Sequence, residues 1–441
     1  MRSPNNLSER IAEQIAPLIP RQSTILVGLS GGVDSVVLLH LLNNLATRFS
    51  WQVSAIHVHH GLSPKAGEWA DFCTELCARH HIPLHIEHVD VTPLREHGIE
   101  AAARKLRHAA FAKIECNYVA LAHHADDQVE TLLLQLLRGA GVRGAAAMPM
   151  HVEQSGTHGV LRPLLNFSRQ EIAAYAEEQG LQWIEDESNA DVSYPRNFLR
   201  HRVLPVLEQK FPAYRETLER SIRNFVEASE LLDQLAKSDA GQDLQSETLP
   251  VEALRKLPII RAKNLLRYFL HGQGAPMPHS AQLEEMLRQI CEARQDAAVN
   301  IQYGAHQVRR FRDRVYVLPT QTPCDHDFVL TWKGETELDW PPLRTRLKFS
   351  RLTGAGICLG KLKDAPVTLR LRKGSETIRP HPAASTRTLT NLLQQHHIPP
   401  WQRERLPLFF CGEKLVCVVG ITIDAEYQAI NDEEGVLVSC D

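Results

Sequence analysis

The sequence lacks the cysteine patterns that mark disulfide frameworks and zinc ribbons. Its nine cysteines are an odd number, and no two of them form a C-x-x-C pair. Cys73 and Cys77 lie one helical turn apart, a spacing that favours small buried residues on a helix over a metal site completed by His80 or His81. These absences are typical of a protein of the reducing cytoplasm.

Long apolar runs are also missing. No stretch reaches the roughly 20 residues that a transmembrane helix needs, and the N-terminal residues show no cleavable leader pattern. We therefore expect a cytoplasmic protein with no membrane partner.

The chain has no strong excess of charge of either sign. Its 49 Lys and Arg against 52 Asp and Glu give a formal net charge of −3, which argues against a protein that coats nucleic acid without specificity. A local basic face is compatible with this balance. The 441 residues, 43% of them hydrophobic, are enough for packed cores and predict two or three domains.

Short β-branched runs alternate with helical patterns in the first half of the chain. Such alternation predicts right-handed crossovers and a parallel sheet. After about residue 212 the pattern changes to amphipathic helices, followed by short strand-like segments. Strands are predicted at 24–29, 53–61, 84–91 and 118–124, with helices from 36, at 67–81, at 100–116 and from about 125.

This organisation predicts four parts. They are an α/β catalytic domain at 1–212, a mainly helical middle domain with terminal strands at 213–322, an irregular linker at 323–365 and a small α/β domain at 366–441.

The segment SGGVDS, which begins at Ser30, lies between a predicted strand and a predicted helix. Gly31 and Gly32 let the backbone approach phosphate oxygens, and the first N–H groups of the helix point outward, so the segment is expected to bind an anion. Ser35 can donate a hydrogen bond, and Asp34 can hold a magnesium ion. The lysine of a Walker A loop, which neutralises the β and γ phosphates, is missing. Its absence favours attack at the α phosphate, with pyrophosphate as the leaving group.

SGGVDS resembles the PP-loop of the N-type ATP pyrophosphatases, which activate an oxygen by adenylation and release pyrophosphate. The resemblance implies an α/β fold with a parallel sheet, of the adenine nucleotide alpha hydrolase-like kind, with ATP and Mg²⁺ at the site. It also implies an ATP-binding set made of the loop and a histidine of the next motif: Ser30, Gly31, Gly32, Val33, Asp34, Ser35 and His57.

Two further polar motifs follow predicted strands: HVHHGLS, which starts at His57, and AHHADDQVET. The carboxyl ends of parallel strands meet at one edge of the sheet, where ligands bind, so we expect the three motifs to lie together. In the last motif His123, His124, Asp126 and Asp127 cluster at a helix start, where carboxylates can cap the helix and also bind a metal ion or an amine. Glu130 lies three residues after Asp127, on about the same face.

Several stretches together resemble the tRNA(Ile)-lysidine synthetases, and the resemblance spans nearly the whole chain. The sequence departs from the family pattern at Glu187, where a proline is usual, at Ser375, where a glycine is common, and at Thr390, where a lysine is expected. These departures touch individual RNA contacts rather than the chemistry. The stretches are HVHHGLS, EAAARKLRHAAF, HHADDQVET, RPLL, WIEDESNADVSYPRNFLRHRVLP, RKGSE and TLTNLLQQHHIPPWQRERLPLFF.

This resemblance implies a ligase reaction in two steps. ATP adenylates the C2 oxygen of the wobble cytidine in the CAU anticodon of tRNA(Ile), and the ε-amine of free L-lysine then displaces AMP to form lysidine. Asp34 and Asp127 are expected to hold Mg²⁺, directly or through water. Asp126 or Glu130 is expected to bind the lysine ammonium, and a nearby carboxylate or His123 to take its proton.

Basic residues in two regions are expected to hold the tRNA backbone. Trp401 in the C-terminal run has two interpretations, a core residue or part of a module that grips the tRNA body. The sequence is also compatible with a homodimer of this chain. The candidate tRNA-binding residues are Arg104, Arg107, Arg196, Arg200, Arg202, Arg372, Arg387, Arg403 and Arg405.

Two other functions are compatible with the motifs. The first is another PP-loop enzyme that modifies tRNA, such as a thiolase, although the missing C-x-x-C pair argues against thiolation. The second is an RNA-binding protein that holds ATP without chemistry, although the intact acidic motifs argue against it.

Overall fold

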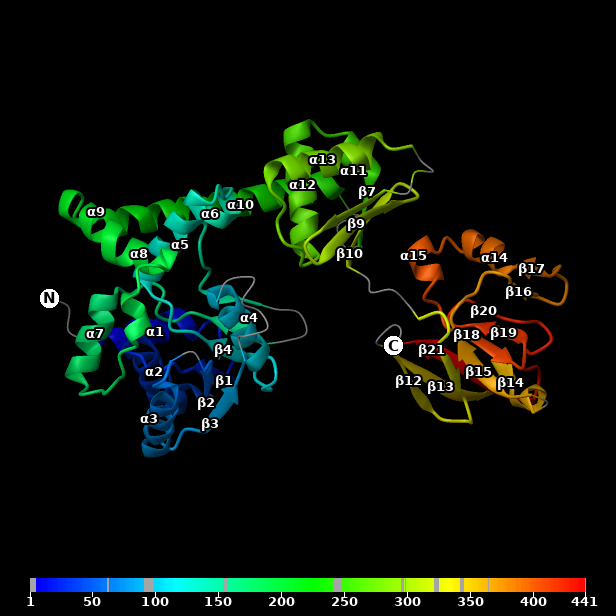
Figure 1. Cartoon of the computed structure of the whole chain (residues 1–441), viewed down its shortest axis with the longest axis horizontal. Helices are drawn as coiled ribbons and strands as arrows, with labels where there is room; N and C mark the ends of the chain where they lie inside the picture. Colours follow the sequence, from blue (N-terminus) through cyan, green and yellow to red (C-terminus); the bar gives the residue numbers. More distant parts are fainter. Residues whose placement is uncertain are drawn as a thin grey trace. The chain divides into compact units, whose positions relative to one another are not determined.

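The computed structural model describes residues 5–61, 63–90, 99–153, 158–241, 247–294, 297, 299–320, 325–341, 345–363 and 365–440. The chain divides into two compact units, Met1–Leu235 and Ala236–Asp441, and helix α10 (Tyr214–Ala240) runs across the division (Figure 1). No helix in the described part of the chain is long and apolar enough to cross a membrane.

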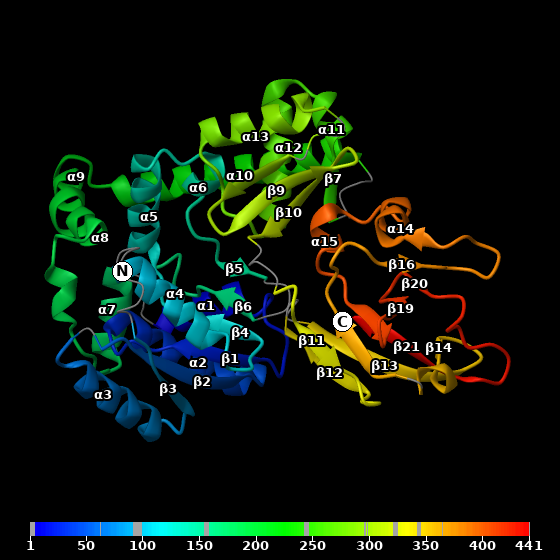
Figure 2. The ribbon, with the colours of Figure 1, turned by 45° about the vertical axis from the view of Figure 1, so that its right-hand side comes forward.

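A six-stranded sheet forms the centre of the first unit, in the order β3-β2-β1-β4-β6-β5 (Figure 2). Strands β1 to β4 and β6 are parallel, and β5 pairs with β6 in the antiparallel sense. The parallel sheet expected from the alternating pattern is therefore confirmed. The strands are β1 (Thr24–Gly28), β2 (Gln52–His59), β3 (Leu84–His88), β4 (Tyr118–Ala120), β5 (His151–Val152) and β6 (Gly159–Leu161).

Helices cover both faces of this sheet because side chains alternate along its strands. Ile25 and Val27 of β1 belong to a core shared with α1, α2, α3 and α7. Leu26 belongs to a second core on the other face, with Phe111 of α4. The helices are α1 (Asn5–Ile15), α2 (Val33–Phe49), α3 (Ala66–Arg79), α4 (Ile99–Phe111), α5 (Ala125–Leu137), α6 (Val142–Ala145), α7 (Arg169–Glu178), α8 (Pro195–Phe198) and α9 (Leu204–Lys210).

The second unit begins with a small α/β module. Three helices pack on a four-stranded antiparallel sheet in the order β7-β10-β9-β8, around a core that includes Leu265, Leu283 and Val308. Its elements are β7 (Thr248–Pro250), α11 (Val251–Arg255), α12 (Ile259–Gly272), α13 (Ser280–Glu292), β8 (Asn300–Tyr303), β9 (His306–Phe311) and β10 (Arg314–Pro319).

Two further sheets share one core in the rest of the unit, with Trp340 from one sheet and Phe409 from the other. Helices α14 (Leu389–Gln395) and α15 (Pro400–Arg403) lie between the strands of this part, which are β11 (Val329–Thr331), β12 (Glu337–Trp340), β13 (Thr345–Thr353), β14 (Ile357–Cys358), β15 (Val367–Arg370), β16 (Thr377–Ile378), β17 (Arg387–Thr388), β18 (Leu408–Cys411), β19 (Lys414–Val418), β20 (Thr422–Ile423) and β21 (Glu434–Cys440).

The expectation of an irregular linker at 323–365 differs from the structure. Its described residues contain strands β11 to β14, and β13 pairs with β21 near the C-terminus, from Leu347↔Cys440 to Thr353↔Glu434. Residues 321–324 and 342–344 lie outside the described residues.

Candidate active site

The three motifs meet at the carboxyl edge of the parallel strands. The loop after β1, the end of β2 with His57 and the start of α5 after β4 all lie there, since β1 pairs in parallel with both β2 and β4. This is the edge at which open α/β sheets bind ligands.

The loop after β1 forms a cradle whose shape depends on glycine. Gly31 has φ +89°, and a Cβ there would lie 2.4 Å from Cδ1 of Ile184. The hydroxyl of Ser35 accepts from the N–H groups of Ser30 and Gly31, at 3.2 Å each, and donates to the carbonyl of Gly32 at 2.9 Å. No side chain among the described residues caps the start of α2. Its first N–H groups therefore face the edge of the sheet and are suited to an anion.

Asp34 in the first turn of α2 carries the least satisfied carboxylate of the site. Its Oδ1 is buried and has no hydrogen-bond partner in the described part of the chain, and its Oδ2 lies 3.8 Å from Nε2 of His124. Burial raises the pKa of Asp34, His124 opposes this shift, and Asp127 adds to it. A cation bound to this carboxylate would offset the cost of burying its charge and the repulsion by Asp127.

The side chains at this edge of the sheet are suited to hold a magnesium ion. Mg²⁺ in proteins is held by one or two carboxylates, substrate phosphates and water. Asp34 has a free oxygen beside the open helix start, while no group of three or more metal-ligating side chains occurs within the described ranges.

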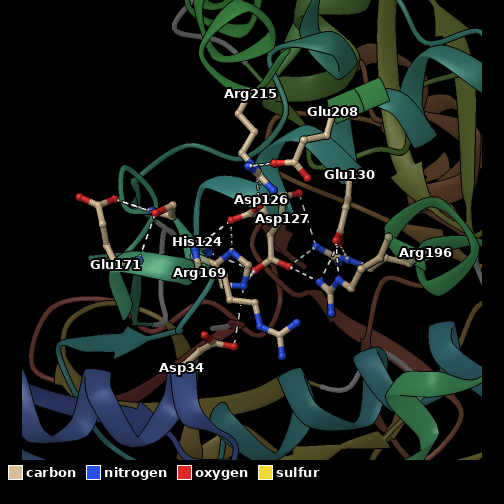
Figure 3. A network of polar contacts seen from close by, with 12 residues as sticks. Asp34, His124, Asp126, Asp127, Glu130, Arg169, Glu171, Arg196, Glu208 and Arg215 are labelled. Carbon is tan, nitrogen blue, oxygen red and sulfur yellow. Dashed lines mark hydrogen bonds and ion pairs between the residues drawn. The ribbon is translucent and has the colours of Figure 1, made fainter. Parts of the chain in front are cut away.

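The start of α5 is a compact acidic turn. Asp127 Oδ2 accepts the N–H of His124 at 3.0 Å, so this carboxylate closes the helix start. Asp126 Oδ2 accepts the N–H of Arg169 at 2.9 Å, and its Oδ1 accepts from Nε of Arg215 at 2.7 Å (Figure 3). Burial would raise the pKa of Asp126, but these two partners outweigh it and lower the pKa.

Glu130, one turn further along α5, is 0% exposed and is held by two arginines. Arg196 donates through Nε to Oε2 at 2.7 Å, and Arg200 donates through Nε to Oε1 at 2.6 Å and through Nη2 to Oε2 at 2.9 Å. Arg196 also donates to Oδ1 of Asp127 at 2.9 Å (Figure 3). Arg200 donates to the same oxygen at 3.2 Å. Burial would raise the pKa of Asp127, but His124 and Arg196 lower it.

The arginines come from α8 and from the π-helical turn Leu199–Val203 that follows it. Such turns are rare and are frequent at functional sites. Arg196 and Arg200 were expected to hold tRNA phosphates, but the structure places them against acidic side chains. Of the same cluster, Arg202 is exposed.

Two histidines at this edge are neutral at physiological pH. His57 is buried, its Nδ1 donates to the carbonyl of Leu29 at 2.9 Å, and burial lowers its pKa. Burial lowers the pKa of His123 to about 3, more than Asp127 raises it. A histidine with this pKa is a weak base, so it is poorly suited to take a proton from an ammonium ion.

The other tRNA candidates lie on the first unit's helix α4 and in the second unit. Arg104 and Arg107 on α4 are exposed. In the second unit Arg372 donates to Thr390 Oγ1 at 2.5 Å, so this departure from the family pattern supplies an acceptor. Arg387 donates to Gln395 Oε1 at 2.7 Å, Arg403 donates to the carbonyl of Ile398 at 2.7 Å, and Arg405 is partly exposed.

Trp401 is a packing residue in this structure. It is buried, and its ring meets those of Tyr316 and Phe311 edge-on, with centroids 5.2 and 6.1 Å apart. The guanidinium of Arg309 lies 5.1 Å from its centroid. The ring thus joins α15 to strands β9 and β10 within the second unit.

Sequence reasoning did not single out Arg162, Arg169 and Arg215, whereas it placed His124 in the polar cluster at the start of helix α5. Arg215 lies just past the expected boundary at 212, so its pairing with Asp126 crosses that boundary. His124 is part of a quoted motif, and its position between Asp34 and Asp127 depends on the meeting of two strands.

The cysteines near the site are buried and unreactive. Burial raises the pKa of Cys73 to about 12 and that of Cys77 to about 11. A thiol with such a pKa carries little thiolate at neutral pH, and the thiolate is the nucleophile. The geometry therefore offers no support for thiolation.

Together the loop, the open helix start and the acidic turn define an ATP-using enzyme of the PP-loop class. Residues 4–207 match the family described as PP-loop domain. Residues 249–316 match the TilS substrate binding domain, and residues 367–440 match the TilS substrate C-terminal domain.

Full-length relatives place the chain more narrowly. A tRNA(Ile)-lysidine synthase of Nitrosomonas europaea is 42% identical over 439 residues, which cover 99% of this chain and 96% of the relative. One of Coxiella burnetii is 36% identical over 415 residues, which cover 94% and 92%. The chain belongs to the tRNA(Ile)-lysidine synthase family. Among solved structures, a U34-tRNA thiolase of Methanococcus maripaludis is 17% identical with a TM-score of 0.44, covering 51% of this chain and 79% of the thiolase.

Proposed function

We propose that this enzyme ligates free L-lysine to C2 of the wobble cytidine in the CAU anticodon of tRNA(Ile), with conversion of ATP to AMP and pyrophosphate. We also propose that the reaction takes place in the cytoplasm. The observation that carries the proposal is the free carboxylate of Asp34 beside the uncapped start of α2, at the same sheet edge as the acidic turn of α5.

In the first step the C2 oxygen of the cytidine attacks the α phosphate and pyrophosphate leaves. The N–H groups of the loop and of α2 hold the phosphates. Asp34 would hold Mg²⁺ through its free oxygen, and Asp127, whose oxygens both accept hydrogen bonds from the protein, would hold it through water. When bound there, Mg²⁺ would supply positive charge to the phosphates and so make pyrophosphate a better leaving group. His57 keeps Nε2 as an acceptor for the nucleotide, because its Nδ1 donates to Leu29.

In the second step the lysine ε-amine attacks C2 and AMP leaves. We assign the ammonium to Asp126 rather than Glu130. Glu130 is 0% exposed and both of its oxygens accept from arginines. The partner of Asp126, Arg215, has a side chain that is 34% exposed, so its replacement by an incoming ammonium is less costly. The proton goes to a nearby carboxylate or to His123. The pKa values do not choose between them, because that of His123 is about 3 and those of Asp126 and Asp127 are lowered.

The test is incorporation of labelled lysine into unmodified tRNA(Ile) with a CAU anticodon, with and without ATP. We expect ATP-dependent label that resists mild alkali, because lysine attached to the base is stable where a 3′ ester is not. Release of AMP that depends on tRNA, without label, would overturn the lysine assignment and keep the adenylation chemistry.

Salt is expected to separate tRNA binding from ATP binding. If about four phosphates are neutralised, tRNA affinity should fall about 100-fold between roughly 50 and 200 mM salt. ATP affinity should change much less, because the loop binds it through N–H groups. Filter binding with labelled tRNA and equilibrium dialysis with ATP measure the two. Equal salt dependence would argue against an extended phosphate contact.

A further inference from the structure

Arg162 is a buried guanidinium at the active edge that the reaction described above does not use. It is the first residue after β6, whose Leu161 pairs with Ala120 of β4. The N–H of Leu121 donates to the carbonyl of Leu161 at 2.9 Å. Arg162 therefore leaves the sheet beside the segment that leads to His123.

This guanidinium is only partly satisfied. Arg162 is 7% exposed, and Nη1 donates to the carbonyl of Pro149 at 2.8 Å. Its Nε is buried without a hydrogen-bond partner, and among the side chains that the structure describes no carboxylate forms an ion pair with it. Buried charges in proteins are almost always paired. Arg196 and Arg200, at the same edge, follow that rule.

The charged groups around Arg162 are mostly basic. Burial and the charge of Arg104 lower the pKa of Arg162 to about 10. His108 faces Arg104, Arg107 and Arg162, and its pKa is lowered first by burial and then by these cations. Nδ1 of His123 is also buried and has no partner in the described part of the chain. Asp127 acts on His123, but it is already bonded to two arginines.

An anion is the missing partner, and it has two sources here, ATP and the RNA. The phosphates of ATP have their own cradle at the end of β1. Strand β4 separates β1 from β6, so Arg162 stands two strand spacings, about 10 Å, to the side. A nucleotide whose base enters the site brings its backbone phosphates to the side of the site. A phosphate that approaches from solvent would reach the exposed side chain of Arg104 before Arg162.

We propose that Arg162, with Arg104, binds one phosphodiester of the tRNA strand next to the cytidine that is modified. This site rests on the proposed function for the identity of its RNA. It would fix the distance between the RNA backbone and the sheet edge, so that only one base reaches the ATP.

The test is a scan of tRNA(Ile) carrying a single uncharged methylphosphonate at each anticodon-loop position in turn. With the wild-type enzyme we expect one position to weaken binding about tenfold, as for the loss of a charge-assisted hydrogen bond. Arg162→Gln should weaken binding of unmodified tRNA by a similar factor, remove the sensitivity to that position, and reduce the salt slope by about one phosphate. ATP affinity should be unchanged.

Two other variants complete the design. Arg79→Gln is the matched control, since Arg79 is exposed at the end of α3, on the opposite edge of the sheet. It should leave the scan unchanged. Arg104→Gln repeats the scan at an exposed position, and it replaces Arg162→Gln should that variant fail to fold.

If both variants respond to each methylphosphonate as the wild-type enzyme does, the inference is wrong. Arg162 would then have only a structural role, through its hydrogen bond to the carbonyl of Pro149. Loss of ATP affinity with normal tRNA affinity would also overturn it, because the anion would then belong to ATP. If wild-type enzyme shows the sensitive position but never incorporates lysine, the proposed reaction fails and the phosphate site stands.

Discussion

Replacement of Asp34 by asparagine is expected to slow pyrophosphate release by a factor on the order of 10³ or more. The amide keeps the size of the side chain and removes its charge, so the cation that neutralises the leaving group loses its free ligand. The tRNA affinity should stay within about twofold, because the substitution leaves unchanged the exposed arginines that we expect to contact RNA. Pyrophosphate release with tRNA, lysine and Mg²⁺, and filter binding without ATP, measure the two effects.

Asp71→Asn is the matched control for this variant. Asp71 lies exposed on α3, and the same chemical change there should leave both measurements at the wild-type level. Normal pyrophosphate release from the Asp34→Asn enzyme would contradict the assignment of Asp34 as a ligand of Mg²⁺. A parallel loss of tRNA binding would show that the substitution acts on the fold instead.

The catalytic fold could be predicted from sequence because its signals are local. Strand β1 is a short apolar run followed by a polar turn, and SGGVDS has Gly31 where a φ of +89° and the approach of Ile184 exclude a Cβ. The placing of three motifs at one edge then follows from the parallel topology alone.

The partners of the arginines could not be predicted in this way. RNFLRHR was interpreted as a basic surface for RNA, but Arg196 and Arg200 face Asp127 and Glu130, 66 to 73 residues earlier in the chain. The sequence shows charge, and only the packing of α8 and the π-helical turn against α5 shows whether that charge is already neutralised. The charge of Arg162, by contrast, is not neutralised by its surroundings, because the groups around it are mostly basic.

The strands between 323 and 365 were missed for a related reason. β12 and β14 are short, and β13 finds its partner β21 more than 80 residues later. Pro323, Pro341 and Pro342 made the stretch look irregular, and the pairing that completes its strands is non-local, which sequence periodicity does not record.

Glu130→Ala tests whether the buried acidic and basic cluster is structural as well as catalytic. Removing Glu130 leaves two guanidinium groups, each with a side chain less than a quarter exposed, to share Asp127. The loss of one partner from such a cluster typically costs about 3–5 kcal/mol. Hydrogen exchange of the amides in α5 and α8 measures the local loss of stability.

Glu9→Ala is the control for the stability cost of Glu130→Ala, because it removes the acidic partner of an exposed ion pair. The pair Glu9–Arg48 also has a short contact, 2.9 Å, but both side chains are more than half exposed, so its loss should cost less than about 1 kcal/mol. A cost for Glu130→Ala no greater than that of Glu9→Ala would mean that the arginines leave Glu130 readily. In that case Glu130, rather than Asp126, would become the better candidate for the lysine ammonium, because its partners could be exchanged for substrate.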